Sequence, residues 1–572
     1  MIKLSDISRP AKTLTCFLIG WIILNLLQAA FTPLNHDEAY YWMYSKYLAW
    51  GYFDHPPMIA LMIRIGYFIF HNELGVRLIS VISSAVSLVV VWALTNNGKR
   101  GKAGAEWIFI MLAGTLPLFH IFGFMATPDS PLLLFTALFL LAFKKFSGQD
   151  KFQTAFLLGI SMAALMYSKY HGALLIIFVI LSNLRLLRTP WFYFSAVLAL
   201  VLFLPHINWQ FVNGFPSLRF HLVERVSGFN PGNIPDYLLN LLLIHNPLIF
   251  PLTLLFVFRK KVFTSFEKTL VFILVGFIIF FFIQSFRYHI EPQWTAIITV
   301  PMIIILFNSL DFHSAEGKYL RNTAIFFIPL ILFARIAFMI DFLPVHFLKK
   351  EYHNTRKRED AIARLAGDRP VIFTNSYQEP SEYTFYTGRF ALSLNNLNYR
   401  KTQYDIWNFE EKVHGKEILY VPHYLNDYIT ENFTKVKFPW GDSTYVKVIK
   451  DFQSLQKECV ILERKSYAFS ATASDTIHLK IFNPYPFPIN LRHQELPVVF
   501  QISFLKNGYR EVKKNLELPA SVSILNVNDT LKLDCSFTLE DLPAGKYKMA
   551  IGSETGYLYD VYNSPFTDAE VK

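Results

Sequence analysis

The sequence predicts a polytopic α-helical membrane protein with an extracytoplasmic α/β region and a C-terminal β-sandwich. Of its 572 residues, 53% are hydrophobic, and the mean hydropathy is +0.31. Only 17% are charged, against about 25% in an average soluble domain. The apolar residues crowd into residues 1–342, and the remainder has the pattern of ordinary soluble protein. A single soluble globule, a disordered chain, a collagen-like fibre and a disulfide scaffold are poor fits.

The first apolar run, from Leu14 to Phe31, is long enough to cross about 30 Å of hydrocarbon. Lys3, Arg9 and Lys12 precede this run, and no small-x-small cleavage site follows it. We therefore expect an uncleaved first span with a cytoplasmic N-terminus rather than a signal peptide.

Further apolar runs bring the expected number of spans to about eleven. They occupy residues 75–95, 105–122, 131–146, 153–168, 171–186, 191–207, 237–258, 268–285, 294–309 and 323–342. Only Ser168 to His171 interrupts the stretch 153–186, so this stretch is either one kinked helix or two short ones.

Clusters of basic residues alternate along the chain with loops rich in Asp, Glu and His. Loops on the cytoplasmic side of a membrane protein carry an excess of Lys and Arg, so we attribute the net charge of +11 to membrane orientation. An odd number of spans then places residues 343–572 on the extracytoplasmic side. No RNA- or DNA-binding motif occurs, so we expect the lipid bilayer and no nucleic acid as a partner. The basic clusters are Lys99/Arg100/Lys102, Lys144/Lys145/Lys151, Arg185/Arg188, Arg259/Lys260/Lys261 and Lys318/Arg321.

The first outer loop, residues 32–74, carries the most informative polar residues. Asn35 followed by Glu38 has the spacing of a capping box, which predicts an aromatic helix over 36–50. Its first turn would hold Asp37 and Glu38, where the helix dipole favours carboxylates. Asp37 and Glu38 either lie in a solvent-exposed first turn or belong to a functional site that includes Asp54 and His55. Pro56-Pro57 then predicts a second short helix, although turn chemistry alone also accounts for Asp54-His55.

Other polar residues lie at span ends on the same side. Asp129, between two prolines, is an N-cap of the fourth span, a ligand for a sugar hydroxyl or metal, or both. Lys169 interrupts apolar sequence, and such a lysine either snorkels or pairs with an anion. The further candidates are Tyr170, His171, Arg219, His221, Glu224, Arg225, Arg287, His289, Glu291 and Trp294.

The outer side carries carboxylates together with Lys, Arg and His. These are the side chains that an enzyme would use to transfer a group from a phosphate-linked substrate. Such a reaction needs a base, and cations or a metal for the phosphate. No Walker or Rossmann glycine pattern occurs, so no nucleotide cofactor is expected and a lipid-carried donor is favoured.

The run HDEAYYWMYSKYLAWGYFDHPPM (36–58) resembles the first outer loop of the GT-C glycosyltransferases. The more similar group is that of the dolichyl-phosphate-mannose protein mannosyltransferases, with the bacterial aminoarabinose lipid A transferases. The resemblance covers residues 13–450. It implies a GT-C fold in the bacterial inner (plasma) membrane. It also implies a polyprenyl-phosphate sugar donor and transfer on the extracytoplasmic side, usually with inversion.

The resemblance also implies roles for individual residues. Asp37 corresponds to the catalytic base or orienting carboxylate, and Asp129 to the second carboxylate of the cavity. Asp54-His55 replaces a Glu-Lys pair associated with metal and phosphate, and His221 is a candidate for the additional metal-binding histidine. A divalent metal is therefore an open expectation. The residues expected to bind substrate or phosphate are Glu38, Tyr40, His55, Lys169, Tyr170, His171, Arg219, Arg287 and His289.

The soluble part is expected to form two domains, residues 343–457 and 458–572, after a catalytic membrane domain of residues 1–342. The first mixes helical and strand patterns; its Tyr- and Glu-rich segment 375–389 is either a surface loop or a neighbour of the active cavity. The second alternates in short strands, as in an immunoglobulin-like β-sandwich. Cys16 is expected to pack in the first span. Cys459 and Cys535 form a disulfide or remain two separate thiols.

Two other functions stay open. A transporter or flippase of a lipid-linked sugar would be expected to have inverted repeats and charges at the bilayer midplane, and neither is apparent. A non-catalytic membrane-anchored recognition protein would not need so many spans. The sugar is not readable, and the acceptor is a glycolipid, a glycan or a protein.

Overall fold

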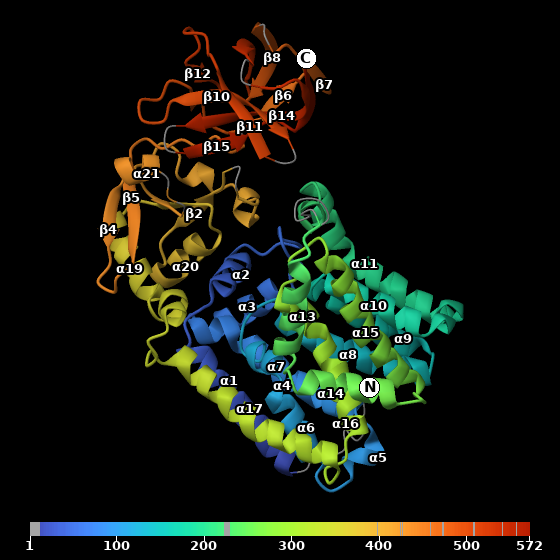
Figure 1. Ribbon diagram of the computed structural model, residues 1–572. Helices are drawn as coiled ribbons and strands as arrows, with labels where there is room; N and C mark the ends of the chain where they lie inside the picture. The colour runs from blue at the N-terminus through green and yellow to red at the C-terminus, as the bar shows by residue number, and fades with distance from the viewer. Residues whose placement is uncertain are drawn as a thin grey trace. The chain divides into compact units, whose positions relative to one another are not determined.

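The computed structural model describes residues 12–221, 229–396, 399–423, 425, 427–457, 459–471, 474–506, 509–539, 542–555 and 558–572. The chain divides into two compact units, Met1–Thr355 and Arg356–Lys572. The first unit is helical and the second is rich in strands (Figure 1). A short helix and a π-turn lie at the end of the first unit and reach His353.

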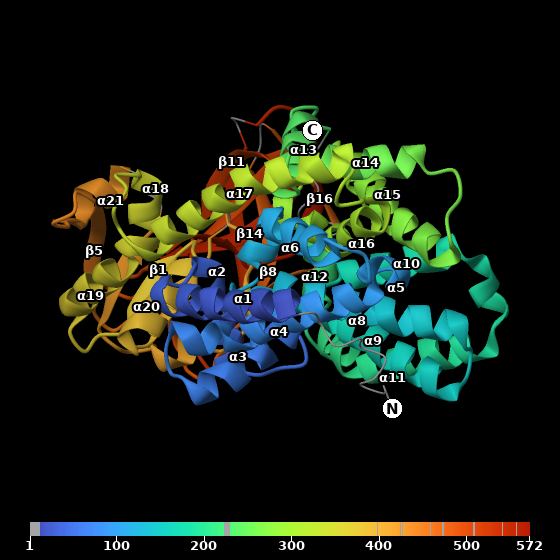
Figure 2. The same cartoon turned by 90° about the horizontal axis from the view of Figure 1, so that it is seen from below.

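Seven segments of the membrane unit are long and apolar enough to cross a membrane, within the described residues. They are α1 (Lys12–Phe31), α4 (Glu73–Leu94), α8 (Asp129–Gly148), α11 (Pro190–Val212), α15 (Ser265–Ser285), η4 with α16 (Pro292–Ser309) and α17 (Ala315–Met339). Helices α1 and α17, from opposite ends of this unit, lie side by side (Figures 1 and 2). A polytopic helical membrane fold is confirmed.

Three shorter apolar helices lie in other predicted runs: α6 (Ala105–Thr115), α9 (Phe152–Ser168) and α10 (His171–Ser182). A fourth, α3 (Met58–Ile69), is the second short helix predicted after Pro56-Pro57. The stretch 153–186 is thus two helices, separated at Lys169. The run 237–258, predicted as one span, is instead a pair, α13 (Asn233–Ile244) and α14 (Ile249–Arg259), bent by 94°. The bend lies at Asn246, whose backbone adopts φ +70° and whose side chain accepts the N–H of Leu248 (2.9 Å) immediately before α14.

Short helices complete the membrane unit. They are α2 (His36–Lys46), α5 (Asn97–Arg100), α7 (Pro117–Ile121), η2 (Leu184–Arg188), α12 (Pro216–Arg219), α18 (His346–Leu348) and η5 (Lys349–His353). Helix α2 ends at Lys46, four residues before the predicted end. The cause is Tyr52, whose hydroxyl donates to the carbonyl of Tyr44 (3.0 Å) and accepts the N–H of Ala49 (3.0 Å), so the chain turns back.

The second unit begins with a five-stranded sheet of order β2-β1-β3-β5-β4. Strands β1 (Val371–Thr374), β2 (Ala391–Leu394) and β3 (Ile418–Pro422) are parallel, whereas β4 (Thr434–Lys437) and β5 (Ser443–Ile449) are antiparallel additions. Helices α19 (Thr355–Ala366), α20 (Gln378–Thr387) and α21 (Asp427–Asn432), with η6 (Gln403–Asp405) and η7 (Glu410–Lys412), accompany the sheet. The predicted Tyr- and Glu-rich segment 375–389 is mainly helix α20.

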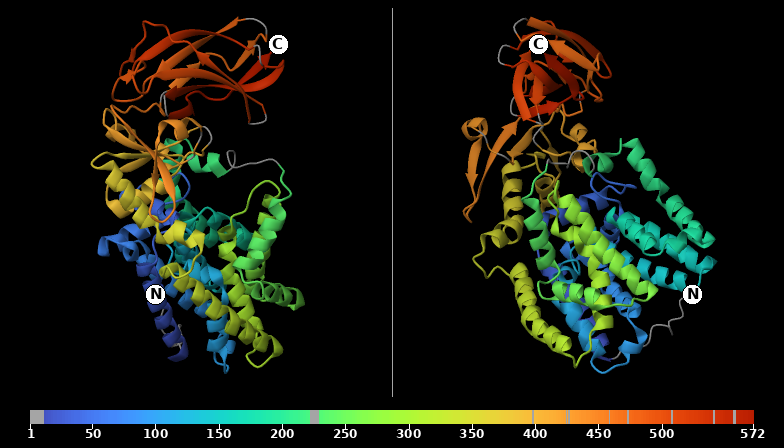
Figure 3. Two further views of the ribbon diagram at one scale, coloured as in Figure 1. Left: turned by 60° about the vertical axis from the view of Figure 1, so that its left-hand side comes forward. Right: turned by 45° about the vertical axis from the view of Figure 1, so that its right-hand side comes forward.

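Most of the remaining strands form two sheets that share one apolar core, a β-sandwich (Figure 3). One has the order β11-β10-β14-β16-β7, with β15 on β14, and the other β13-β8-β6; β9 and β12 pair separately. The strands are β6 (Cys459–Leu462), β7 (Ser466–Phe469), β8 (Ser474–Phe482), β9 (Ile489–Asn490), β10 (Val498–Lys506), β11 (Tyr509–Leu516), β12 (Ile524–Leu525), β13 (Thr530–Thr538), β14 (Gly545–Thr555), β15 (Leu558–Tyr562) and β16 (Thr567–Val571). This order resembles that of immunoglobulin-like sandwiches.

Candidate active site

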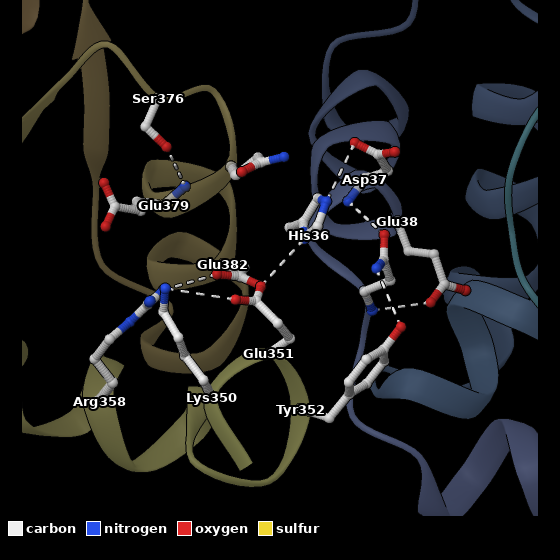
Figure 4. Close-up of polar contacts among 12 residues, drawn as sticks. His36, Asp37, Glu38, Lys350, Glu351, Tyr352, Arg358, Ser376, Glu379 and Glu382 are labelled. Atoms are coloured by element: carbon white, nitrogen blue, oxygen red, sulfur yellow. Dashed lines mark hydrogen bonds and ion pairs between the residues drawn. The ribbon is translucent and has the colours of Figure 1, made fainter. Parts of the chain in front are cut away.

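The start of α2 is held by the capping box that the sequence predicts. The Asn35 side chain accepts the N–H of Asp37 (3.0 Å), and the Glu38 carboxylate accepts the N–H of Asn35 (3.0 Å). Tyr352 accepts a further hydrogen bond from the Asn35 amide (3.3 Å), drawn in Figure 4. The two capping hydrogen bonds restrain the backbone at the first turn of α2, which carries Asp37.

The adjacent carboxylates Asp37 and Glu38 have opposite environments. The side chain of Asp37 is 37% exposed, with the His36 ring nitrogen 4.0 Å from its Oδ1. Glu38 is completely buried. Figure 4 shows the two side chains pointing to different sides of α2. Of this pair, only Asp37 is open to a reacting group.

Asp129 lies in a buried ion pair. Lys169 Nζ is 2.7 Å from Asp129 Oδ1, and both side chains are about as buried as core residues, at 5% exposure each. The charges of Asp37 and Asp129 are close enough to interact. Asp129 is the first residue of α8 and Pro128 is the N-cap, so the prediction of Asp129 as the N-cap is off by one residue. The break between α9 and α10 places Lys169 opposite it.

Tyrosines and histidines surround Asp54. The Tyr44 hydroxyl donates to Asp54 Oδ2 (3.3 Å), and burial raises the pKa of Tyr44 well above its usual value, with Tyr40 and then Asp54 adding to the rise. Tyr44 therefore stays a neutral donor. The Tyr170 hydroxyl lies 3.1 Å from His206 Nε2, and its ring centroid lies 6.1 Å from that of His221.

The three residues proposed as metal ligands do not form a ligand set. Among the described residues, no group of three or more His, Cys, Asp or Glu side chains could hold a metal ion. His221 Nε2 lies 3.5 Å from the backbone carbonyl of Asp54, and His55 packs edge-on against Tyr41 with ring centroids 5.6 Å apart. The described residues therefore do not fit a metal ion.

The other predicted residues are distributed over the same unit. Tyr40 is buried in α2, and His171 lies against Trp294 with ring centroids 5.6 Å apart. Arg219, Arg287 and His289 are exposed, so their cationic or imidazole groups are accessible. Their roles in binding stay predictions. Glu224 and Arg225 lie outside the described residues.

Sequence reasoning missed two groups of polar residues. Arg77, completely buried, binds Glu38 through two nitrogens, and Gln210 donates to Tyr170 (2.9 Å) and to Ser217 (2.7 Å). Arg77 stands alone near the start of the predicted span 75–95, and a charge inside a span is a functional signal. That signal could have identified Arg77, but its partner lies 39 residues earlier.

Comparisons with known proteins identify a related family and a shared fold. Residues 54–209 match the model of the dolichyl-phosphate-mannose-protein mannosyltransferase family. Two crystal structures of ArnT from Cupriavidus metallidurans are similar to this chain at 13% identity, covering 76% of this chain and 97% of ArnT. The apo structure has a TM-score of 0.58, and the structure bound to undecaprenyl phosphate has 0.57. No curated protein matches the sequence. The chain has the fold of ArnT, the GT-C fold predicted above.

Proposed function

We propose that this protein is a membrane glycosyltransferase that moves one sugar from a polyprenyl phosphate to an acceptor on the extracytoplasmic face of the bacterial plasma membrane. The observation that carries the proposal is the accessible carboxylate of Asp37 within electrostatic range of Asp129, which lies in the buried Asp129–Lys169 pair. The family-model match and the shared fold support it, as does the capture of undecaprenyl phosphate by ArnT.

A single displacement suits this arrangement of carboxylates. A hydroxyl oxygen of the acceptor attacks C1 of the sugar, its proton passes to Asp37, and the C1–O bond breaks with its electron pair leaving on the phosphate. One displacement inverts the configuration at C1. Asp129 is neutralised by Lys169 and is therefore suited to orienting the sugar hydroxyls rather than to attacking C1.

The departing phosphate needs positive charge. Exposed Arg219 and Arg287 supply guanidinium groups, which match phosphate oxygens in pairs. Lys169 donates to Asp129, and because an ammonium group has three N–H donors it can also donate to a phosphate or sugar oxygen. His55 and His289 add imidazole nitrogens that can bind phosphate oxygens.

Asp37→Asn should lower transfer by about 10²–10⁴-fold, the usual contribution of a general base. The assay incubates the purified full-length protein with undecaprenyl phosphate carrying radiolabelled pentoses or hexoses, in the presence of native membranes, and measures released undecaprenyl phosphate. Asp236→Asn is the matched control, because Asp236 is an exposed carboxylate in the first turn of α13. Near-normal turnover in Asp37→Asn would remove Asp37 from the mechanism.

The rival function, transport or flipping of a lipid-linked sugar, is separated by the same assay. A transferase releases undecaprenyl phosphate and labels an acceptor, whereas a flippase returns the donor chemically unchanged. Unchanged donor across the whole panel of sugars would contradict the proposed transfer, and the mass of a labelled acceptor would show whether it is a glycolipid, a glycan or a protein.

A further inference from the structure

Arg77 and Glu38 form a completely buried ion pair in which the guanidinium uses every donor. Its Nε donates to Glu38 Oε1 (2.8 Å) and its Nη2 to Glu38 Oε2 (2.5 Å). An arginine has five N–H donors, so three remain. These three donate to the carbonyl oxygens of Ala29 (3.1 Å), Thr32 (2.5 Å) and Pro33 (2.9 Å). Arg77 thus also satisfies carbonyls at the C-terminal end of α1 that have no helical partner.

The acceptor sites of the Glu38 carboxylate are also all occupied. Besides the two bonds from Arg77, Oε2 accepts the N–H of Asn35 (3.0 Å) and Oε1 accepts the N–H of Ala126 (2.8 Å). A carboxylate offers about four lone-pair sites, and all four are occupied. Glu38 therefore has no acceptor capacity left for a substrate while these bonds persist.

The two backbone amides on Glu38 belong to the two segments that carry the candidate carboxylates. Asn35 precedes Asp37 by two residues, and Ala126 precedes Asp129 by three. One buried carboxylate consequently ties the start of α2 to the segment entering α8. Moving either segment would break a charge-assisted hydrogen bond in a buried site, which is strongly unfavourable.

We propose that Arg77 and Glu38 are positioning residues that set the separation of Asp37 and Asp129. This inference rests on the proposed function, since it assigns Asp37 and Asp129 to the reaction. It gives Glu38 a different role from the substrate contact expected from sequence. Misplacing a reacting group by 1 Å costs about 10²-fold in rate, so an intact pair is required for turnover but not for donor binding.

The test compares Arg77→Gln, Arg77→Lys and Glu38→Gln in the purified full-length protein. Two readouts are taken: hydrogen exchange at the amides of Asn35 and Ala126, and kcat against the Kd for undecaprenyl phosphate. We expect faster exchange at both amides and a fall in kcat of about 10²-fold, with Kd changed less than threefold. Arg77→Lys keeps the positive charge but loses the planar guanidinium that binds the carboxylate through two nitrogens. The fall in kcat should therefore be smaller in Arg77→Lys than in Arg77→Gln.

Arg335→Gln is the matched control, because Arg335 is another buried arginine of the membrane unit, bound to Gln28, Asn25 and His120. It touches neither amide, so their exchange should stay unchanged.

Unaltered exchange at Asn35 and Ala126 in Glu38→Gln would overturn the inference, and so would unaltered kcat despite faster exchange. Loss of undecaprenyl phosphate binding would show a direct substrate contact instead. If the wild type transfers no sugar, the proposed function fails, while exchange still reports whether the pair fixes both segments.

Discussion

At the scale of single residues, the Asp129–Lys169 pair determines how the candidate site is charged. Each side chain is 5% exposed, and the two atoms are 2.7 Å apart. Burying either ion alone costs several kcal/mol, and the attraction between them offsets that cost only while both are present. Lys169 therefore has a structural task in addition to any contact with substrate.

Lys169→Met should lower the free energy of unfolding by about 3–5 kcal/mol, because Asp129 is left buried without a countercharge. The double variant Lys169→Met/Asp129→Asn should recover most of that loss, since the remaining amide carries no charge. Thermal unfolding in detergent micelles measures both. Lys46→Met is the control, because Lys46 is exposed at the end of α2. A double variant no more stable than the single one would show that the pair is not the cause.

At the scale of elements, helices α19 and α20 of the second unit are joined by buried charge. Arg358 on α19 lies 2.9 Å from Glu382 on α20 and 2.8 Å from its neighbour Glu359, as Figure 4 shows in part. Glu359 is completely buried, and burial raises its pKa from 4.5 to about 7, although Arg358 opposes the rise. The folded protein thus holds this proton more tightly than the unfolded chain.

The raised pKa gives a stability change of defined sign. Between pH 4.5 and about 7 the folded carboxyl keeps a proton that the unfolded chain has lost, so Glu359 makes stability fall as pH rises through this window. Glu359→Gln removes this contribution. The unfolding midpoint of Glu359→Gln minus that of the wild type should therefore increase from pH 5 to pH 8. Glu417→Gln, in the exposed pair with Arg369, is the control. A difference independent of pH would contradict the shift.

Elements were predictable from sequence where their signals are local. The capping box at Asn35 and Glu38 depends on residues three apart, and the break at Lys169 depends on one charge within an apolar run. The bend between α13 and α14 was missed, because the apolar run masked Asn246, whose positive φ only the fold reveals. The Arg77–Glu38 pair was missed because its members are 39 residues apart.

At the scale of the whole molecule, the sequence predicts the polytopic helical membrane fold and the strand-rich C-terminal part, because both follow from composition and periodicity over long stretches. The GT-C fold was expected only from the resemblance of residues 36–58 to that family. The prediction that residues 343–572 lie on the extracytoplasmic side rests on the basic loops and on an odd number of spans. The sequence left the pairing of Cys459 and Cys535 open, and the structure has both as thiols outside any disulfide, with Cys459 exposed and Cys535 buried. This difference allows the orientation to be measured.

A membrane-impermeant maleimide should label Cys459 in intact spheroplasts if the second unit is extracytoplasmic. Cys535 should not react, because burial raises the pKa of its thiol to about 11 and the thiolate is the nucleophile. Cys16, in α1, should stay unlabelled because lipid excludes the charged reagent. Cys459→Ser should abolish the signal, and inside-out vesicles should not be labelled until detergent is added. The opposite pattern, labelling of vesicles but not of spheroplasts, would place the second unit in the cytoplasm. It would also move Asp37 away from an extracytoplasmic acceptor.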